Sequence, residues 1–293
     1  MNKVKIISDS ACDLPKHLLV ANDIDYISMI CTLGDTDYRA LLGWENLSPT
    51  ELYTMMRNGV KPMMSLIKDV DFKEKFEEYL SQGYDIVYIA VSSGLSASIK
   101  GSYRVREELK EKYPNQQIHI VDSLVGDMSQ GLICLRAAEL RDEGKSSQEI
   151  YEALENEKFN YHQCGTVSDL KYLRNAGRVK ASAAFFANLI GIKPILISDI
   201  EGKNVPIAKI RGRKQSIEYM ADYVKNHIVD PEKHLLSIIH ADCYEDAVLF
   251  KEEILKRVPN VKEIMISDCG WIIGCSAGPT TLNVYFYGVK RTE

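Results

Sequence analysis

The stretch "DIVYIAVSSGLSASIKGSY", residues 85–103, joins a continuous apolar run to a run of small and hydroxyl side chains. The first part, 85–91, has the length and the apolar content of a buried strand. From residue 97 onwards, apolar side chains recur every three to four positions, which is the spacing of an amphipathic helix. A strand that passes through small residues into a helix is the repeating unit of an α/β fold.

The same alternation extends on both sides of this stretch. Further strand-like runs lie at 3–8, 23–30 and 117–121, and helical patterns lie at 70–83, 97–113, 126–144 and 146–159. Short connections between such runs predict a parallel, Rossmann-like sheet with helices on both faces. Ligands bind beyond the carboxyl ends of the strands in these sheets, so we expect "SDSACDLP" (8–15) and "SSGLSAS" (92–98) at the ligand edge.

The pattern changes near residue 160. Strand-like runs at 194–199, 204–210, 234–240, 261–267 and 283–289 now alternate with helical runs at 168–175, 179–191, 212–228 and 243–257. The segment "SDIEGKNV" (198–205) has the Gly and Asn residues of a hairpin turn. We therefore expect an N-terminal α/β domain over 1–160 and a C-terminal α+β domain with a mixed or antiparallel sheet over 161–293.

Composition excludes several classes of protein. The 293 residues carry a formal net charge of -5, which argues against nucleic-acid binding. No run approaches the roughly 18 apolar residues of a membrane helix, and the start lacks a signal peptide, so we expect a cytoplasmic protein without stable membrane insertion. The seven cysteines include no C-x-x-C and the histidines no H-E-x-x-H, so we expect no metal and no cofactor.

The segment "SSGLSAS" permits two interpretations. It is either a tightly packed strand–helix junction or an anion site built from hydroxyls and free N–H groups at a helix start. The P-loop pattern G-x-x-x-x-G-K-[ST] and the nucleophile pattern G-x-S-x-G are both absent. An alternative function is a serine hydrolase or an acyl or phosphoryl transferase that uses the 92–98 loop. A serine nucleophile needs a base, and His240 is the only histidine at an apparent strand end.

Two other segments are of interest. In "SDSACDLP", Asp13 is placed to cap a helix that begins at Pro15. In "LKYLRNAGRVKASAAFFANLIGIKPIL" (170–196), Arg178 and other basic residues precede a helix pattern that is apolar almost all round. Such a helix is either buried in a core or faces an apolar ligand, for which the basic residues would mark the mouth of an acyl-chain tunnel.

The order and spacing of several motifs resemble the DegV family over essentially the whole chain. These motifs are "SDSACDLP", "SSGLSASI", "DSLVGDMSQG", "LKYLRNAGRV", "IKPILISDIEGK" and "IRGRK". The resemblance implies a two-lobed fold and a protein that binds a long-chain fatty acid and is not an enzyme. It further implies that the carboxylate is held between the lobes, as in the binding subunit of bacterial fatty-acid kinase, for presentation to a separate kinase.

The resemblance also implies roles for individual residues. Ser96 would donate to the carboxylate, Ser93 would lie nearby, Arg178 would lie beside the head group, and Arg211 would face the kinase partner. The resemblance assigns no catalytic residue in this chain.

At two positions the sequence departs from the family pattern. The family has a threonine where "PMMSLIKD" (62–69) places Met64, with Ser65 beside it. It has a histidine where "CSAGPT" (275–280) places Ser276. Loss of the threonine removes a donor to the carboxylate, loss of the histidine removes a possible positive charge, and Ser65 and Ser276 would compensate in part. Binding of the chain is therefore better supported than readiness of the carboxylate for phosphorylation.

Overall fold

The computed structural model describes residues 2–167, 169–180, 185 and 191–292. Its first part contains a four-stranded sheet with the strand order β2-β1-β6-β7, in which every pair is parallel. The strands are β1 (Lys3–Asp9), β2 (Ile24–Ile27), β6 (Tyr84–Ala90) and β7 (Ile118–Asp122). The apolar runs at 3–8, 85–91 and 117–121 therefore form strands of a parallel sheet, as predicted.

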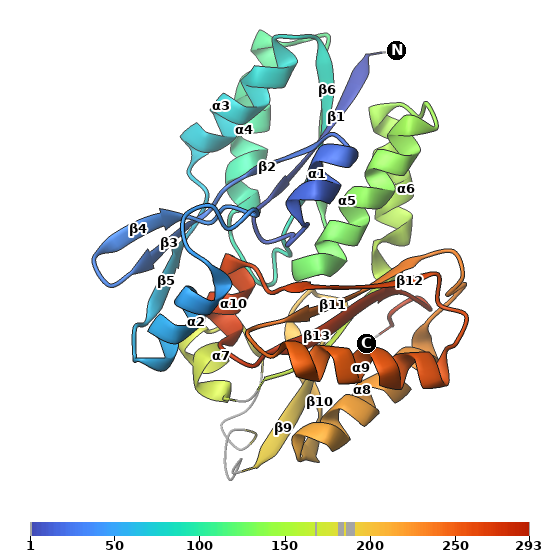
Figure 1. Ribbon diagram of the computed structural model, residues 1–293. Helices are drawn as coiled ribbons and strands as arrows, with labels where there is room; N and C mark the ends of the chain where they lie inside the picture. The colour runs from blue at the N-terminus through green and yellow to red at the C-terminus, as the bar shows by residue number, and fades with distance from the viewer. Residues whose placement is uncertain (1, 168, 181–184, 186–190, 293) are drawn as a thin grey trace.

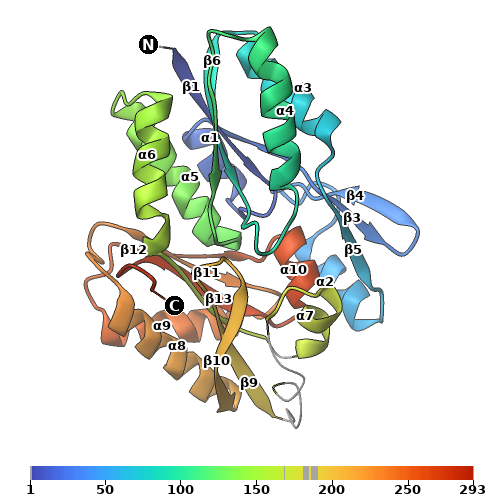
Figure 2. The ribbon, with the colours of Figure 1, turned by 180° about the vertical axis from the view of Figure 1, so that it is seen from behind.

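Helices cover both faces of this sheet (Figures 1 and 2). They are α1 (Lys16–Ala21), α3 (Asp69–Leu80), α4 (Ile99–Lys112), α5 (Asp127–Asp142) and α6 (Ser147–Glu157). Helices α3 and α4 pack together on one face, and α5 and α6 pack together on the other. The start of α6 is fixed by a capping box, in which Ser146 accepts from the Glu149 N–H and the Glu149 carboxylate accepts from the Ser146 N–H.

A small antiparallel sheet, with the order β4-β3-β5, was not predicted. It consists of β3 (Ile30–Leu33), β4 (Thr36–Arg39) and β5 (Pro62–Ser65), and α2 (Pro49–Arg57) connects its second and third strands. The predicted single strand over 23–30 was wrong, because the chain leaves the parallel sheet after Ile27 and enters this one at Ile30. Ser10 stabilises the chain between β2 and β3, because its hydroxyl accepts from the Met29 N–H at 2.9 Å.

The second part of the chain forms a six-stranded mixed sheet with the order β10-β9-β8-β13-β11-β12. Its strands are β8 (Tyr161–Thr166), β9 (Ile192–Ser198), β10 (Asn204–Arg211), β11 (Leu235–His240), β12 (Glu263–Asp268) and β13 (Leu282–Tyr287). Strands β11 and β12 pair in parallel, and the other neighbours pair antiparallel. Strands β9 and β10 form the predicted hairpin, and the fold class is the predicted one.

Helices α8 (Arg213–His227) and α9 (Tyr244–Arg257) bury one face of the mixed sheet, and the other face is turned toward α5 and the first part of the chain (Figure 1). The remaining helical segments are the 3-10 turn η1 (Lys158–Asn160), α7 (Leu170–Ala176) and α10 (Trp271–Ala277). Most of the predicted helix at 179–191 lies outside the described residues. Among those residues, none of the helices has the length and apolarity needed to cross a membrane.

The two lobes share a packed boundary. The main hydrophobic cluster of the first lobe continues into the second through Ile239, Trp271, Cys275 and Tyr285. Arg291 adds a polar clamp, since its guanidinium donates to the carbonyls of Ser198 and Asp199 in the β9–β10 turn and of Leu124 after β7. The change of sheet falls near residue 160, and the division into domains at that point stays a prediction.

Candidate functional site

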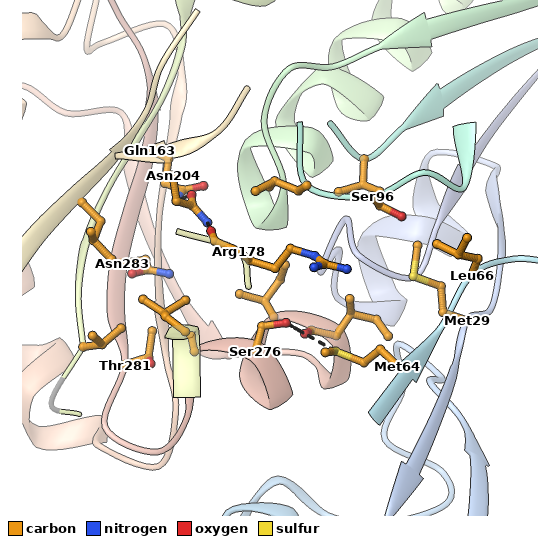
Figure 3. Close-up of a pocket in the computed structure, with 18 of the residues that line it drawn as sticks. Met29, Met64, Leu66, Ser96, Gln163, Arg178, Asn204, Ser276, Thr281 and Asn283 are labelled. Carbon is orange, nitrogen blue, oxygen red and sulfur yellow. Dashed lines mark hydrogen bonds between the residues drawn. The ribbon is translucent and has the colours of Figure 1, made fainter. Parts of the chain in front are cut away.

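A cavity of about 100 Å³ lies between the two lobes (Figure 3). Its walls come from the small sheet, the β6–α4 loop, α7, α10 and one face of the mixed sheet. The apolar part of the lining is formed by Met29, Met64, Leu66, Val91, Leu95, Val167, Leu173, Leu196, Ile272, Ile273 and Ala277. The polar part is formed by Ser65, Ser96, Gln163, Arg178, Asn204, Ser276, Thr281 and Asn283. An apolar wall with a few convergent polar groups is the usual form of a small-molecule site.

The structure brings most of the predicted ligand residues together. Ser65, Met64, Ser96, Arg178 and Ser276 all line this cavity although they come from four separate segments of the chain. Figure 3 shows the Arg178 side chain extending into the space between Ser96 on one side and Ser276 with Met64 on the other. What each residue contributes to binding stays a prediction.

The loop that carries Ser96 is held rigidly on both sides. Asp9, at the end of β1, accepts from the Val91 N–H at 2.9 Å, and Ser92 donates to the Gly202 carbonyl at 2.7 Å. Gly94 is pressed against the same turn, because a Cβ at this position would lie 2.6 Å from the Glu201 carbonyl oxygen. The small residues of this loop therefore allow close contact between the lobes, and they also fix the place of Ser96.

The Ser96 hydroxyl is part of a short serine chain. It lies 3.1 Å from the Ser98 hydroxyl, and it accepts from the Ser98 N–H at 3.2 Å. The buried Ser98 hydroxyl in turn accepts from the Ile67 N–H at 3.2 Å, which ties the loop to the segment after Ser65. A hydroxyl can rotate its single hydrogen, so Ser96 is able to turn its donation from Ser98 toward a ligand oxygen.

Ser93 and Arg211 lie outside this lining. Ser93 is exposed, and its N–H donates to the Asp122 carboxylate at 3.1 Å. Arg211 is exposed at the end of β10, and among the described residues its side chain has no hydrogen bond or ion pair. Arg178 is also exposed, and its guanidinium donates to the Ala176 carbonyl at 2.7 Å.

His240 has its own surroundings in the second lobe. Its Nδ1 lies 3.8 Å from the Asp268 carboxylate, and its ring meets Tyr244 edge to face. Burial lowers the pKa of His240. In the described part of the chain, none of the hydroxyls in the 92–98 loop hydrogen-bonds to a histidine, and their partners are Gly202, Gly94, Ile67 and one another.

The predicted helix cap at Asp13 was wrong. Helix α1 begins after Pro15 without a side-chain cap, and the Asp13 carboxyl instead accepts from the Gly270 N–H at 2.7 Å, at the start of α10. The residues Ser8, Asp9 and Ser10 of the same motif are buried and hydrogen-bonded to backbone groups, and none of them lines the cavity. This motif therefore supports the neighbouring loop and the lobe boundary.

Asp13 faces Asp127 inside the boundary. Burial raises the pKa of both carboxyls, and the adjacent Asp127 raises the pKa of Asp13 further. Asp127 accepts from the Tyr285 hydroxyl and the Met128 N–H, which favours its charged form, so we infer that Asp13 is the protonated member of the pair. The ligand atoms of Asp13, Asp127 and Cys269 lie within 4.8 Å of one another, and burial raises the pKa of all three, so a metal ion would have to displace protons from Asp13 and Cys269 to bind here.

Four polar residues of the cavity were missed by the sequence analysis. Gln163, Asn204, Thr281 and Asn283 lie together on the mixed-sheet side, opposite Met64, Leu66 and Ser96 (Figure 3). Strand β8, which carries Gln163, was not predicted, and the runs at 204–210 and 283–289, which carry Asn204 and Asn283, were predicted only as strands. The sequence signal that could have indicated them is a polar residue inside an otherwise apolar strand such as β13.

Known proteins share this sequence pattern and this architecture. A family model described as "Uncharacterised protein, DegV family" matches residues 3–288. A DegV domain-containing protein of Clostridium perfringens is 39% identical over 288 residues, which cover 98% of each chain.

Two solved structures are similar over nearly their whole length. DegV from Bacillus subtilis, described as a fatty acid binding protein, is 26% identical, with a TM-score of 0.85 over 98% of this chain and 100% of that one. A DegV family protein from Thermus thermophilus, whose structure concerns fatty acid binding, is 24% identical and has a TM-score of 0.88 over 99% and 100% of the two chains. On the match over residues 3–288 and the 39% identity, this chain belongs to the DegV family.

Proposed function

We propose that this protein binds a long-chain fatty acid in the cavity between its lobes. The observation that carries the proposal is the lining itself, in which one guanidinium and several hydroxyls face a wall of aliphatic side chains and methionines. The carboxylate would meet Ser96 and Arg178, and the chain would follow the apolar wall toward Leu196 and Val167, where the walls must move apart because a cavity of about 100 Å³ is smaller than a long acyl chain. Support comes from the Bacillus subtilis relative, which is described as a fatty acid binding protein.

The energetics of the ligand fit such a site. Burial of about 14 methylenes at ~0.8 kcal/mol each gives on the order of 11 kcal/mol before the cost of ordering is subtracted. The tail therefore supplies most of the affinity. A carboxylate buried without partners would cost several kcal/mol, so the site must offer donors to it. Arg178 and Ser96 are of the right chemistry, and neither needs a base or a nucleophile beside it.

The proposal includes presentation of the bound carboxylate to a separate kinase, with no catalytic residue in this chain. Arg211 is the suggested contact, because it is exposed, lies outside the cavity lining and has no hydrogen bond or ion pair among the described residues. An arginine in that state is free to pair with an acidic group of a partner.

The test is extraction of the purified protein with organic solvent, followed by mass spectrometry and by rebinding to the delipidated protein. We expect near-equimolar fatty acid and saturable rebinding. Arg178→Ala should weaken rebinding, whereas Arg211→Ala, a matched loss of one exposed arginine, should leave it unchanged. A protein that yields no fatty acid and takes none up contradicts the proposal. Loss of bound lipid in Arg211→Ala contradicts the assignment of Arg211 to a partner.

A further inference from the structure

The mixed-sheet side of the cavity is polar where an acyl chain would lie. Antiparallel pairing aligns Asn283 with Gly165 and Tyr285 with Gln163, so Asn283 and Gln163 are diagonal neighbours on one face of the sheet. Asn204, on β10, reaches the same place and accepts from Gln163 Nε2 at 3.0 Å. We call Gln163, Asn204 and Asn283 the amide floor of the cavity.

The orientation of the Asn283 amide is fixed by its neighbours. The Tyr285 hydroxyl donates its hydrogen to Asp127, so it can only accept from Asn283, whose Nδ2 lies 2.8 Å away. The same nitrogen lies 3.4 Å from the Asp127 carboxylate oxygen that accepts from Tyr285, so one N–H is shared between these two neighbouring oxygens. The nitrogen side of the amide therefore faces Tyr285 and Asp127, and the oxygen is turned the other way.

The Asn283 oxygen is an acceptor without a donor in the described part of the chain. It is packed against Gly165, where a Cβ would be only 1.8 Å from it, so the oxygen occupies space that a glycine at that position leaves free. Asn283 as a whole is 7% exposed and lines the cavity. The oxygen keeps accessible surface in the cavity, so it pairs with water or with a donor from the ligand that covers it.

The other two amides of the floor offer hydrogen-bond donors. Gln163 uses one N–H on Asn204, and Asn204 uses one N–H on the Arg178 carbonyl at 3.0 Å. Each side-chain NH₂ has two hydrogens, so each retains one donor. The amide floor therefore presents an acceptor at Asn283 and donors beside it. A hydroxyl is the ligand group that both donates and accepts, whereas a ketone only accepts.

On this ground, and resting on the proposed function, we propose that the preferred ligand is a hydroxy fatty acid, whose chain hydroxyl donates to Asn283 Oδ1. An unsubstituted chain laid over this floor would cover the acceptor with methylenes and leave it unpaired, which is the expensive arrangement for a buried polar atom. The hydroxy acid removes that penalty and keeps the apolar contacts of the remaining chain.

The experiment compares ligands on the delipidated full-length protein. Dissociation constants are measured for stearic acid, for its 3-, 10- and 12-hydroxy derivatives and for 10- and 12-ketostearic acid, by displacement of a fluorescent fatty acid. We expect one hydroxystearic acid to bind about tenfold more tightly than stearic acid, the factor given by one net hydrogen bond. The keto acids should gain less, because a ketone can accept from the remaining amide N–H groups but leaves Asn283 Oδ1 without a donor.

Two variants test the assigned atom. Asn283→Leu should bring the ratio of the two dissociation constants close to one, by weakening the hydroxy acid and strengthening stearic acid. Asn260→Leu is the matched control, because Asn260 is an exposed asparagine outside the cavity lining, and it should leave the ratio unchanged. If Asn283→Leu does not fold, the ratio of the dissociation constants of stearic acid and hydroxystearic acid in the wild-type protein still tests the proposal.

The outcomes separate the two proposals. Stearic acid bound as tightly as every hydroxystearic acid overturns the inference and leaves fatty-acid binding intact, because a water then satisfies Asn283. No binding of any of these acids overturns the proposed function itself. If Asn283→Leu still prefers the hydroxy acid, the hydroxyl does not bind at Asn283 and the assignment is wrong.

Discussion

The Ser276 hydroxyl lies 3.3 Å from the Met64 sulfur, across the boundary between α10 and β5. It also donates to the Ile272 carbonyl at 2.9 Å, one turn earlier in its own helix. Its single hydrogen is therefore shared between a backbone oxygen and a thioether, which is a weak acceptor. At the two positions where the family resemblance leads one to expect a histidine and a threonine, the side chains face each other.

Met64→Thr should strengthen binding of the carboxylate, because it places a hydroxyl donor where the thioether is now. Hydrogen bonds to charged groups contribute about 1.5–3 kcal/mol, so the dissociation constant for stearic acid should fall by about tenfold or more. Met63→Thr is the matched control, since Met63 is the adjacent residue, is 62% exposed and does not line this cavity. Titration of delipidated protein gives both constants, and an equal gain in the control would place the head group elsewhere.

Ser96→Ala should weaken binding by about tenfold, the effect of one hydrogen bond lost from a carboxylate. The control is Ser93→Ala, three residues away, because Ser93 is exposed and outside the lining. Rates of fatty-acid release from the two variants give the comparison. Equal rates would contradict the place given to the carboxylate, and a larger effect at Ser93 would move the site to the outside of the loop.

Hydrophobic spacing was enough to predict the long elements. Runs such as 85–91 and 70–83 form β6 and α3, because their burial pattern is set within one segment. The small sheet was missed for a physical reason, since each of its strands has four residues and β4 is mostly exposed. Such strands are ordered by pairing with one another, and sequence periodicity does not report pairing.

The candidate site could likewise be predicted from the sequence only in part. Ser96, Met64 and Ser276 belong to motifs with recognisable sequence, and all three line the cavity. The amide floor belongs to no such motif. Gln163, Asn204 and Asn283 meet only through the register of β8, β10 and β13. A shift of one residue in any of these strands would turn its amide to the other face.

Asp13→Asn should raise the free energy of unfolding, by an amount that grows with pH above about 4. Burial raises the pKa of Asp13, so the folded protein keeps this proton where the unfolded chain, with a pKa near ~3.9, has released it. Stability from this group is therefore present at low pH and is lost as the pH rises toward the folded pKa, by at most about 1.4 kcal/mol per pH unit. An asparagine can donate to Asp127 and accept from Gly270 without a titrating proton.

Denaturant unfolding of wild type and Asp13→Asn at several values between pH 5 and pH 8 measures this difference. Asp127→Asn is the control, since it removes the carboxylate that accepts from Tyr285 and should destabilise the protein by about 1–3 kcal/mol throughout this range. A difference between Asp13→Asn and wild type that does not change with pH would show that Asp13 is ionised in the folded protein.

Oxidation should join Cys31 to Cys275 before any other pair of thiols. Their sulfurs lie 3.3 Å apart and must approach to about 2.0 Å to form the bond, a small movement between β3 and α10. With diamide as the oxidant, the two thiols lose two hydrogens to the reagent and one disulfide forms. Burial of both cysteines slows the reaction, so we expect it over minutes to hours under native conditions.

The disulfide would tie together two walls of the cavity. Cys31 is the strand partner of Met64, and Cys275 precedes Ser276 in α10, so the bond would hold β5 and α10 at a fixed distance. Release of bound fatty acid should therefore slow in the oxidised protein and recover after reduction, with Cys275→Ser unaffected by diamide. Peptide mapping by mass spectrometry identifies the pair. A Cys12–Cys134 product in its place would contradict the expected order of oxidation. Release that does not slow when Cys31 and Cys275 are joined would show that these two walls need not separate for the ligand to leave.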